Sequence, residues 1–541
     1  MGIQIFEQEG IFQINTEHTT YLMGLVDGKY LGHLYYGRRM EDHEGRYLLR
    51  AGDSGQEVYK RRRDKIIFMD TFHFEYPAFG TGDFRDSCLR VRDEGGYRVC
   101  ELHYAGYGVL EGKPALPGMP ATFAGKEEGQ GAQTLVIFLK DEVLGLKIEL
   151  RYSVFEDCDA IVRSVAAVNE GEKKLYLEKI LSACLDMDNE DFRMITLHGS
   201  WARERHIQAQ KIGQGKHVAA SMRGESSHYV HPFLALTTDG TSQKTGDVYA
   251  MNFVYSSNFL AEAELDHRDS VRMSMGLHPD GFEWVLDPGA RFETPEVAMA
   301  YSSAGLGHMT RTFHRLYRNH LIRSKYLHKK RPILINNWEA TYFDFDDDKL
   351  AAIAEQAKEL GIEMLVMDDG WFGKRDGDEC ALGDWVVNEN KLKGGLKALV
   401  DRVNALGLKF GIWFEPEMVS PDSDLYRAHP DWAIQAPGRE ISMGRHQYVL
   451  DLTRQEVVDF VYESVASVIR SANIEYVKWD MNRQLTDLGS FGLDAEHMGE
   501  FSHRYVLGVY QLQERLLQEF PDLLLENCSG GGGRFDAGML Y

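Results

Sequence analysis

The stretch IEYVKWDMNR, residues 474–483, decides the fold prediction. A strand-like apolar run ends here on Asp480, and Lys478, Trp479 and Asn482 lie within two positions of that carboxylate. A buried carboxylate is costly unless neighbours hold its charge, and Lys478, two residues away, points to the same strand face. An ionised carboxylate at the carboxyl end of a barrel strand can serve as a nucleophile or an electrostatic stabiliser. A structural salt bridge at a strand end gives the same local pattern.

The same strand, loop and helix order repeats on both sides of this stretch. Strands are predicted to end at ILINNW (333–338), EMLVMDDGWF (363–372), LKFGIWFEPEM (408–418), IEYVKWD (474–480) and LLLENCSGGGG (523–533). Helices are predicted at 346–361, 396–407, 455–472 and 503–520. Apolar strands alternating with helices predict a parallel sheet, and polar residues at the strand ends favour a (β/α)₈ barrel of the TIM type. A doubly wound open sheet is the alternative, but no GxGxxG follows the first strand.

The chain before residue 325 has a different character. Short β-rich runs alternate with turn signals at 19–37, 97–109, 134–155, 159–171, 231–240 and 247–256. They predict a large antiparallel β-sandwich of two sheets. An amphipathic, basic helix is predicted at 308–325. The predicted domains are therefore 1–325, a β-sandwich ending in a helical linker, and 326–541, a partial barrel of about five βα units.

Composition limits the partners of the protein. The 541 residues carry a net charge of -23, which argues against nucleic acid and anionic membranes and favours a neutral polar substrate. No run approaches 18 consecutive apolar residues, and the start lacks the features of a signal peptide. Six scattered cysteines without a CxxC form neither a disulfide framework nor a zinc site. These features predict a cytoplasmic protein.

Two adjacent carboxylates, Asp368 and Asp369, end the second predicted strand. Side chains alternate along a strand, so both reach one ligand only where the strand breaks into a loop, as Gly370 suggests. Such a pair can bind a metal ion or accept several hydrogen bonds from sugar hydroxyls. Because no histidine is near this pair or Asp480, the sequence favours a polyol and predicts neither metal nor cofactor.

The first and third strand ends supply two tryptophans and two acids. Trp338 can stack on the apolar face of a sugar, although core packing explains a lone tryptophan more often. Glu415 and Glu417 are rival catalytic carboxylates. The alternative is that they hydrogen-bond neighbouring loops and the guanidinium of an arginine.

The remaining candidates lie in loops. Arg445, between the third and fourth strands, can bridge hydroxyls or pin a carboxylate, although a surface arginine is the default interpretation. Cys528 and the glycine run 530–533 follow the fifth strand, and glycines let the backbone approach a ligand closely. The run lacks the GK[ST] of a Walker loop. Cys528 has no obvious base beside it, so it is predicted to line a site rather than to attack a substrate.

Taken together, five motifs resemble those of glycoside hydrolase family 36, the bacterial α-galactosidases. They are RPILINNWEATYF, VMDDGWFG, GIWFEPEMVS, YVKWDMNR and ENCSGGGGRFD. YLGHLYYGRR and EYPAFGTGDFR are similar to the N-terminal sandwich of the same family. The resemblance covers essentially the whole chain, with the motifs in the order of the family.

The resemblance implies hydrolysis of terminal α-galactose residues from melibiose, raffinose and stachyose with retention of configuration. It makes Asp480 the nucleophile of a covalent galactosyl-enzyme, places Asp368 and Asp369 on the hydroxyls farthest from the anomeric carbon, and puts Lys478 and Asn482 beside the nucleophile. The further implied substrate-binding residues are Arg445, Trp479, Cys528, Gly530, Trp338 and Trp413. It also implies a homotetramer, in which a sandwich loop with Asp83, Phe84 and Arg85 reaches the site of a neighbouring subunit.

One motif of the family is not found in residues 1–541. The acid/base of the family is an aspartate in a serine-aspartate-aspartate run on the sixth strand, and a retaining glycosidase needs two carboxyls about 5–5.5 Å apart. Glu526 and Asp536 are on the wrong strand to replace it. We therefore expect a galactosidase truncated within the barrel, with its acid/base beyond residue 541. The alternatives are a galactosyltransferase of the raffinose-synthase type and a catalytically inactive sugar-binding fragment.

Overall fold

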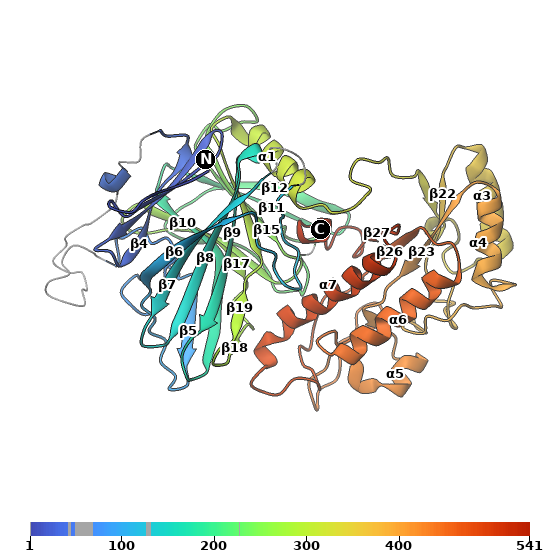
Figure 1. Cartoon of the computed structure of the whole chain (residues 1–541). Helices are drawn as coiled ribbons and strands as arrows, with labels where there is room; N and C mark the ends of the chain where they lie inside the picture. Colours follow the sequence, from blue (N-terminus) through green and yellow to red (C-terminus); the bar gives the residue numbers. More distant parts are fainter. Residues whose placement is uncertain (1, 42–44, 49–68, 126–130, 227) are drawn as a thin grey trace. The chain divides into compact units, whose positions relative to one another are not determined.

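The computed structural model describes residues 2–41, 45–48, 69–125, 131–226 and 228–541 (Figure 1). The chain forms two compact units. The first consists of Met1–Met222, His228–Ile322 and Asp536–Tyr541, and the second of Arg223–Ser227 and Arg323–Phe535. The main division falls close to residue 325, where the sequence predicts a boundary, but two short segments lie on the other side of the predicted division.

Non-local contacts explain both exchanges. Residues 223–226 belong to the second unit because they hydrogen-bond to its other residues. Leu485 N donates to Arg223 O at 3.0 Å, and Ser226 Oγ donates to Gly533 O at 3.1 Å. At the other end, Ser256 Oγ donates to Asp536 at 2.7 Å within the first unit, where Ala537 packs on Val254 and Leu321.

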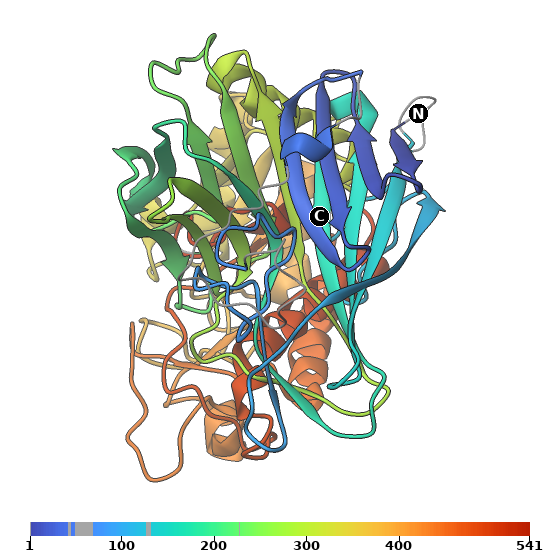
Figure 2. The ribbon, with the colours of Figure 1, turned by 90° about the vertical axis from the view of Figure 1, so that its left-hand side faces the viewer.

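The described residues of the first unit form three antiparallel sheets, whose strands are drawn in Figure 2. The four-stranded sheet has the order β1-β2-β3-β4, with β1 (Ile3–Phe6), β2 (Ile11–Asn15), β3 (Thr19–Val26) and β4 (Tyr30–Arg38). The six-stranded sheet contains β13 (Gly215–Ser221), β16 (Phe259–Leu265), β17 (Ser270–Leu277), β10 (Leu175–Asp188), β18 (Trp284–Leu286) and β5 (Leu89–Asp93). The ten-stranded sheet contains β12 (Arg203–Lys211), β11 (Arg193–Ser200), β14 (Phe233–Thr237), β15 (Val248–Val254), β20 (Glu296–Ser302), β9 (Ala160–Asn169), β8 (Leu146–Phe155), β7 (Gln133–Asp141), β6 (His103–Glu111) and β19 (Arg291–Glu293).

The hairpin between β7 and β8 shows how the sequence builds these sheets. Asp141 Oδ1 accepts the backbone N–H groups of Val143 and Leu144, and Gly145 takes a positive φ of 65° that closes the turn. The first seven residues of β8 then alternate between buried and half-buried positions. One face of the strand thus enters the apolar core. The predicted antiparallel sandwich is confirmed, but the predicted number of sheets is wrong, because the described strands β1–β4 form a separate third sheet.

Helix α1 (Gly305–His320) covers part of the ten-stranded sheet. Phe313 and Leu316 bury themselves against sheet residues such as Ala250 and Ala298. The helix was predicted at 308–325, so its predicted end is wrong by five residues. Past it, Arg323 and Lys325 form ion pairs with Glu514 and Asp522 of the second unit instead of extending the helix.

The second unit contains a five-stranded parallel sheet with helices between the strands. The strand order is β21 (Leu334–Asn336), β22 (Met364–Met367), β23 (Lys409–Phe414), β26 (Tyr476–Trp479) and β27 (Leu524–Asn527). The helices are α2 (Trp338–Thr341), α3 (Asp347–Glu359), α4 (Gly395–Ala405), α5 (Asp424–Ala428), α6 (Gln455–Ser471) and α7 (Phe501–Glu519), and a short antiparallel pair joins β24 (Met418–Val419) and β25 (Tyr448–Val449).

Short 3₁₀ turns occur in both units, at Gly45–Leu48, Glu156–Cys158 and Gly538–Leu540 in the first and at Pro430–Trp432 and Met498–Glu500 in the second.

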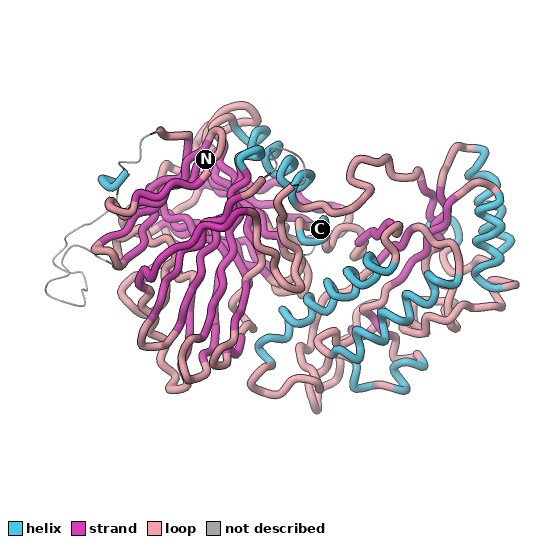
Figure 3. Tube along the Cα trace, viewed as in Figure 1, coloured by secondary structure: helices cyan, strands magenta, loops and turns pink. Residues whose placement is uncertain are grey.

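The strand order separates the two predicted α/β architectures. The parallel strands follow one another in chain order across the sheet, as in a (β/α)₈ barrel. A doubly wound sheet reverses its strand order at a switch point near the middle. The partial-barrel prediction is therefore confirmed, and helices are concentrated in this unit (Figure 3). Within the described residues, no helix is long and apolar enough to cross a membrane.

Candidate active site

The predicted polar residues follow the carboxyl ends of neighbouring parallel strands, which meet at one edge of the sheet. Asn336 ends β21, Asp368 follows β22, Glu415 follows β23 and Asp480 follows β26. In register, Asn336 pairs with Val366, and Phe414 pairs with Trp479. The hydrogen bonds described below join these groups into one site.

Asp480 is held by four N–H donors. Its Oδ2 accepts from Trp413 Nε1 at 3.1 Å and from Asn482 Nδ2 at 2.9 Å. Its Oδ1 accepts the backbone N–H groups of Gly530 at 2.9 Å and of Met481 at 3.1 Å. The residue is only 6% exposed. Every donor is electrically neutral, so the carboxylate is fixed in position without a contacting cation.

These surroundings keep Asp480 ionised. Burial alone raises the pKa of a carboxyl, but the charge of Lys478 and the donated hydrogen bonds outweigh it and lower the pKa of Asp480 below its ordinary value. An ionised, oriented carboxylate has the properties of a nucleophile.

Lys478 makes its direct ion pair with Asp368 rather than with Asp480. Its Nζ lies 2.9 Å from Asp368 Oδ2, and Asn336 Nδ2 donates to the same oxygen at 2.5 Å. The sequence predicted that Lys478 would hold the charge of Asp480, two residues away. Its positive charge does stabilise the ionised Asp480, but its direct ion pair is with Asp368. Burial favours the neutral amine, yet the charge of Asp368 keeps the pKa of Lys478 above its ordinary value.

Asp369 is clamped by a residue that the sequence did not reveal. Arg375 Nε and Nη2 donate to the two carboxylate oxygens at 3.0 Å and 2.8 Å, and the arginine is almost completely buried. Burial raises the pKa of Asp369, and the Arg375 charge opposes that rise. The strand ends at Met367 and Gly370 takes a φ of 107°, so the chain breaks at the acid pair as predicted. Because each acid already has a cation, the pair is suited to hydroxyl groups rather than to a metal.

The glycine-rich turn after β27 supplies backbone to the site. Gly530 has a φ of 61°, a conformation that favours glycine, and its N–H points at Asp480 Oδ1. Cys528 N donates to Trp479 O at 2.8 Å, which fixes the start of the turn. Burial, and next the Asp480 charge, raise the pKa of the Cys528 thiol to about 12, so the thiol stays protonated.

The three tryptophans have three different environments. Trp413 is 2% exposed and uses its indole N–H on Asp480, so it does more than form an apolar wall. Trp479 is fully buried and donates to Glu417 Oε1 at 2.8 Å. It points away from the face that carries Lys478, and it supports the strand instead of facing a ligand. Trp338 opens α2, half-buried against Tyr342 and Phe343.

The two rival acids differ in their partners. Glu417 receives Arg534 Nη1 and Nη2 at 2.5 and 2.8 Å and Tyr505 OH at 2.7 Å. It is therefore the arginine-paired structural acid that the sequence analysis considered as an alternative. Glu415 receives the backbone N–H of Asn482 at 2.6 Å and Gln447 Nε2 at 3.1 Å. It is 1% exposed, and it supports the site by fixing the backbone of Asn482.

Arg445 is exposed and lies in a strained turn. Arg445 and His446 both take positive φ values, 53° and 59°. Such conformations in residues other than glycine cost about 1–3 kcal/mol each and cluster at functional sites. Burial raises the pKa of both Asp369 and Glu415, and the positive charge of Arg445 opposes that rise, so its field acts on the site.

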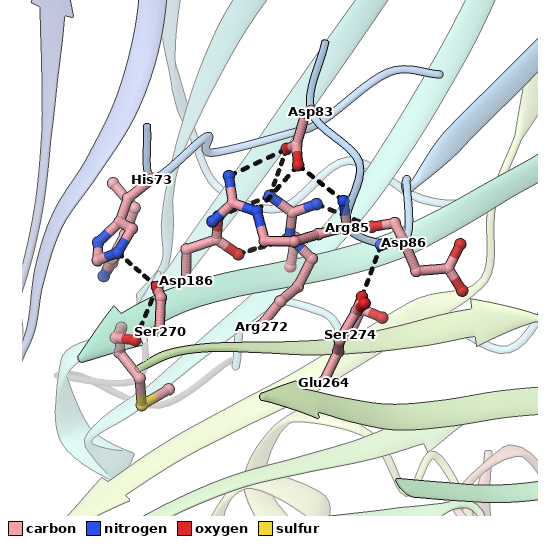
Figure 4. A network of polar contacts seen from close by, with 12 residues as sticks. His73, Asp83, Arg85, Asp86, Asp186, Glu264, Ser270, Arg272 and Ser274 are labelled. Carbon is pink, nitrogen blue, oxygen red and sulfur yellow. Dashed lines mark hydrogen bonds and ion pairs between the residues drawn. The ribbon is translucent and has the colours of Figure 1, made fainter. Parts of the chain in front are cut away.

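The loop with Asp83, Phe84 and Arg85 belongs to the first unit and combines buried and exposed residues. Asp83 accepts Arg85 Nε at 2.9 Å and Arg272 Nη2 at 2.7 Å, and Arg272 also holds Asp186 with two bonds of 2.7 Å (Figure 4). Asp83 and Arg85 thus belong to a buried ion network within the first unit. Phe84 between them is 76% exposed.

An oriented carboxylate lies at the strand ends of a parallel α/β unit, in a chain that also contains an antiparallel sandwich. These features are typical of a sugar-cleaving hydrolase. Two family models match the chain: "Glycosyl hydrolase family 36 N-terminal domain" over residues 29–287 and "Melibiase" over residues 291–541. The chain belongs to glycoside hydrolase family 36.

Named relatives lie in the same family. The α-galactosidase AgaA of Geobacillus stearothermophilus is 46% identical over 541 residues, which are 100% of this chain and 74% of that protein. A crystal structure of an AgaA variant with raffinose superposes with a TM-score of 0.96 at 46% identity, covering 98% of this chain and 74% of that one. The α-galactosidase of Lactobacillus brevis gives a TM-score of 0.98 at 42% identity, covering 100% and 72%. The chain spans about three quarters of the length of these relatives.

Proposed function

We propose that the protein hydrolyses terminal α-galactose residues of α-galactosides, with Asp480 as the nucleophile of a retaining mechanism. The observation that carries the proposal is the ionised Asp480 carboxylate, fixed by four neutral N–H donors at the carboxyl edge of the parallel strands. Family membership and the relatives, which are named α-galactosidases and in two structures hold raffinose or stachyose, support this substrate class.

In the first step, an Asp480 oxygen forms a bond to the anomeric carbon while the bond from that carbon to the leaving oxygen breaks. The leaving oxygen takes the bonding electrons and needs a proton unless it departs as a stable anion. In the second step, the oxygen of a water molecule bonds to the anomeric carbon, the bond from that carbon to Asp480 breaks, its electrons return to the carboxylate, and the proton of the water passes to the solvent. We assign proton transfer to no residue of this chain, so an aryl galactoside with an acidic phenol is the substrate of choice for testing Asp480.

The surrounding groups suit the recognition of hydroxyls. Asp368 and Asp369 offer acceptors whose positions are fixed by Lys478 and Arg375. We propose that they bind the galactose hydroxyls distant from the anomeric carbon. Lys478 and Asn482 would bind the ring hydroxyls beside the nucleophile. A site that hydrogen-bonds particular hydroxyls discriminates strongly against sugars that lack them or place them differently.

Arg445, Cys528, Gly530 and Trp338 complete the proposed site. Arg445 and the Cys528 thiol offer donors, and the φ of Gly530 lets the backbone approach the sugar closely. The Trp338 ring, half-buried, can cover an apolar sugar face.

The test measures phenol release from an aryl α-galactoside by wild type and Asp480→Asn. We expect a loss of at least about 10³-fold, because the amide cannot form the galactosyl ester. A 2-fluoro aryl galactoside should leave one sugar on the peptide that contains Asp480, as read by mass spectrometry. Asp522→Asn, an exposed aspartate of the same unit, is the matched control and should keep the wild-type rate. Full activity of Asp480→Asn would refute the assignment.

We also propose that the protein is a homo-oligomer, a tetramer by resemblance to its family. Phe84 supports this, because it is exposed between two residues that a buried ion network holds rigid. Phe84→Ser should shift the mass measured by light scattering toward smaller assemblies. Val143→Ser, which changes another exposed apolar residue, should not. A monomeric wild type, or an unchanged Phe84→Ser assembly, would contradict the proposal.

A further inference from the structure

Glu415 is a buried acid that the mechanism above does not use. It follows β23 directly, and its Oε1 receives the backbone N–H of Asn482 at 2.6 Å and Gln447 Nε2 at 3.1 Å. Both donors are neutral. Unlike Glu417, which Arg534 clamps with two short bonds, Glu415 is held by amides alone.

Each donor leads to a different part of the proposed site. Asn482 donates its side-chain N–H to Asp480 Oδ2 at 2.9 Å, so Glu415 fixes the residue that orients the nucleophile. Gln447 closes the turn of Arg445: its backbone N–H donates to Gly444 O at 3.1 Å, and Gly444 N donates back at 3.4 Å. The turn contains two consecutive left-handed residues, and Glu415 holds one end of it through the side chain of Gln447.

We propose that Glu415 is a positioning residue for galactosyl transfer, which holds the turn of the nucleophile and the turn of Arg445 in register through the two N–H groups that it accepts. This inference rests on the proposed function and deepens it. A neutral Glu415 suits this role, because the substrate displaces water from Asp480 and a second negative charge nearby is then poorly screened.

The charges around Glu415 support its neutral state. Burial, and next the charge of Asp480 on β26, raise the pKa of Glu415 to about 8. Arg445, from its turn, opposes this rise, and Arg375, from the loop after β22, also interacts with the acid. Asp480 shifts in the opposite direction, so at neutral pH one carboxyl is ionised and the other is not. Since kcat/KM follows the ionisation of the free enzyme, we expect it to fall as the pH rises through about 8.

The experiment compares the pH dependence of kcat/KM for an aryl α-galactoside in the full chain and in Glu415→Gln. The amide keeps an acceptor for both donors and cannot ionise. In Glu415→Gln, the fall in kcat/KM at alkaline pH should therefore occur at a pH at least about one unit higher than in wild type, although the variant loses some activity. Glu389→Gln, an exposed glutamate of the same unit, is the matched control and should keep the wild-type profile. An alkaline limb that is unchanged in Glu415→Gln would overturn the inference.

Two further measurements separate positioning from folding and from the proposed function. Glu415→Leu leaves both donors without an acceptor and should lose about 100-fold in kcat/KM with its circular dichroism unchanged, whereas Glu415→Gln should recover most of that loss. Infrared difference spectra of wild type minus Glu415→Gln should show a protonated carboxyl at pH 7 that disappears near pH 9. This readout needs no activity: an inactive wild type with that band refutes only the proposed function, whereas an active wild type without it refutes only the inference.

Discussion

Asp186 in the sandwich and Asp480 in the second unit are both buried carboxylates, but they are held in opposite ways. Asp186 receives two hydrogen bonds of 2.7 Å from Arg272 and lies 3.4 Å from Arg85 Nη1. Burial opposes its charge, yet the Arg272 charge lowers its pKa to about 2. Asp480 has four contacts of 2.9–3.1 Å, all from neutral N–H groups.

The difference shows how one chain holds one buried acid with cations and another with neutral donors. A guanidinium that binds a carboxylate through two hydrogen bonds neutralises its charge. If the carboxylate then reacts, the buried guanidinium is left without a partner, which is costly. Neutral N–H donors orient a carboxylate but leave its charge available, so it can pass into a new covalent bond without abandoning a buried cation. Four changes test this contrast, from the largest expected effect on stability to the smallest on binding.

Arg272→Met should unfold the sandwich most easily. It removes one of the two arginines that Asp186 and Asp83 share and leaves them with Arg85 alone, which costs about 3–5 kcal/mol of unfolding free energy. Urea denaturation followed by fluorescence measures the loss. Arg98→Met, which removes an exposed pair with Glu178, should cost less than about 1 kcal/mol. Equal losses of unfolding free energy in the two variants would show that the buried network stabilises the protein no more than an exposed ion pair does.

Asp186→Asn should destabilise the protein in a pH-dependent way. The folded-state pKa of Asp186 lies below that of an unfolded aspartate, near 3.9, so its stabilising charge is present above about pH 4. That contribution is lost as the pH falls from about 4 towards 2. The stability gap between wild type and Asp186→Asn should therefore be constant from pH 7 to 5 and narrow below pH 4 in urea melts. A gap that stays constant down to pH 3 would mean that Asp186 is not the acid that titrates.

Asp480→Asn should cost less stability than Arg272→Met, about 1–2 kcal/mol. The amide leaves N–H donors such as Trp413 Nε1 facing an N–H group, but it strands no buried cation, because Lys478 stays paired with Asp368. The same urea melts measure it. A loss as large as that of Arg272→Met would remove the contrast between the two carboxylates.

Arg375→Met should weaken substrate recognition rather than the chemical step. Without its clamp, Asp369 loses its fixed orientation, and we expect KM for an aryl galactoside to rise about tenfold, or about 1.4 kcal/mol. The neighbouring Lys374→Met, at an exposed position, is the control and should leave KM unchanged. A fall in kcat with constant KM would instead place Arg375 in the chemical step.

Local patterns predicted the second unit closely. The helices expected at 346–361, 396–407, 455–472 and 503–520 form at Asp347–Glu359, Gly395–Ala405, Gln455–Ser471 and Phe501–Glu519. Apolar periodicity and Gly stops act within a few residues, so they can be read from one sequence.

Partners far apart in the chain could not be predicted in this way. Nothing near Lys478 in sequence indicates that it pairs with Asp368, 110 positions away. Glu225 is another example: it comes from the β-rich region, yet it receives Gln484 Nε2 at 3.1 Å in the second unit. Burial raises its pKa to about 7.

The sequence by itself determined the two architectures and which strand ends carry polar groups, because hydrophobic periodicity and turn residues are local properties. It also indicated Asp480, through motifs that resemble one family. Only the tertiary structure decided which acids are paired with cations and which are held by neutral donors. That choice depends on side chains that parallel strands bring together at one edge, and those neighbours are set by packing and burial rather than by distance along the chain.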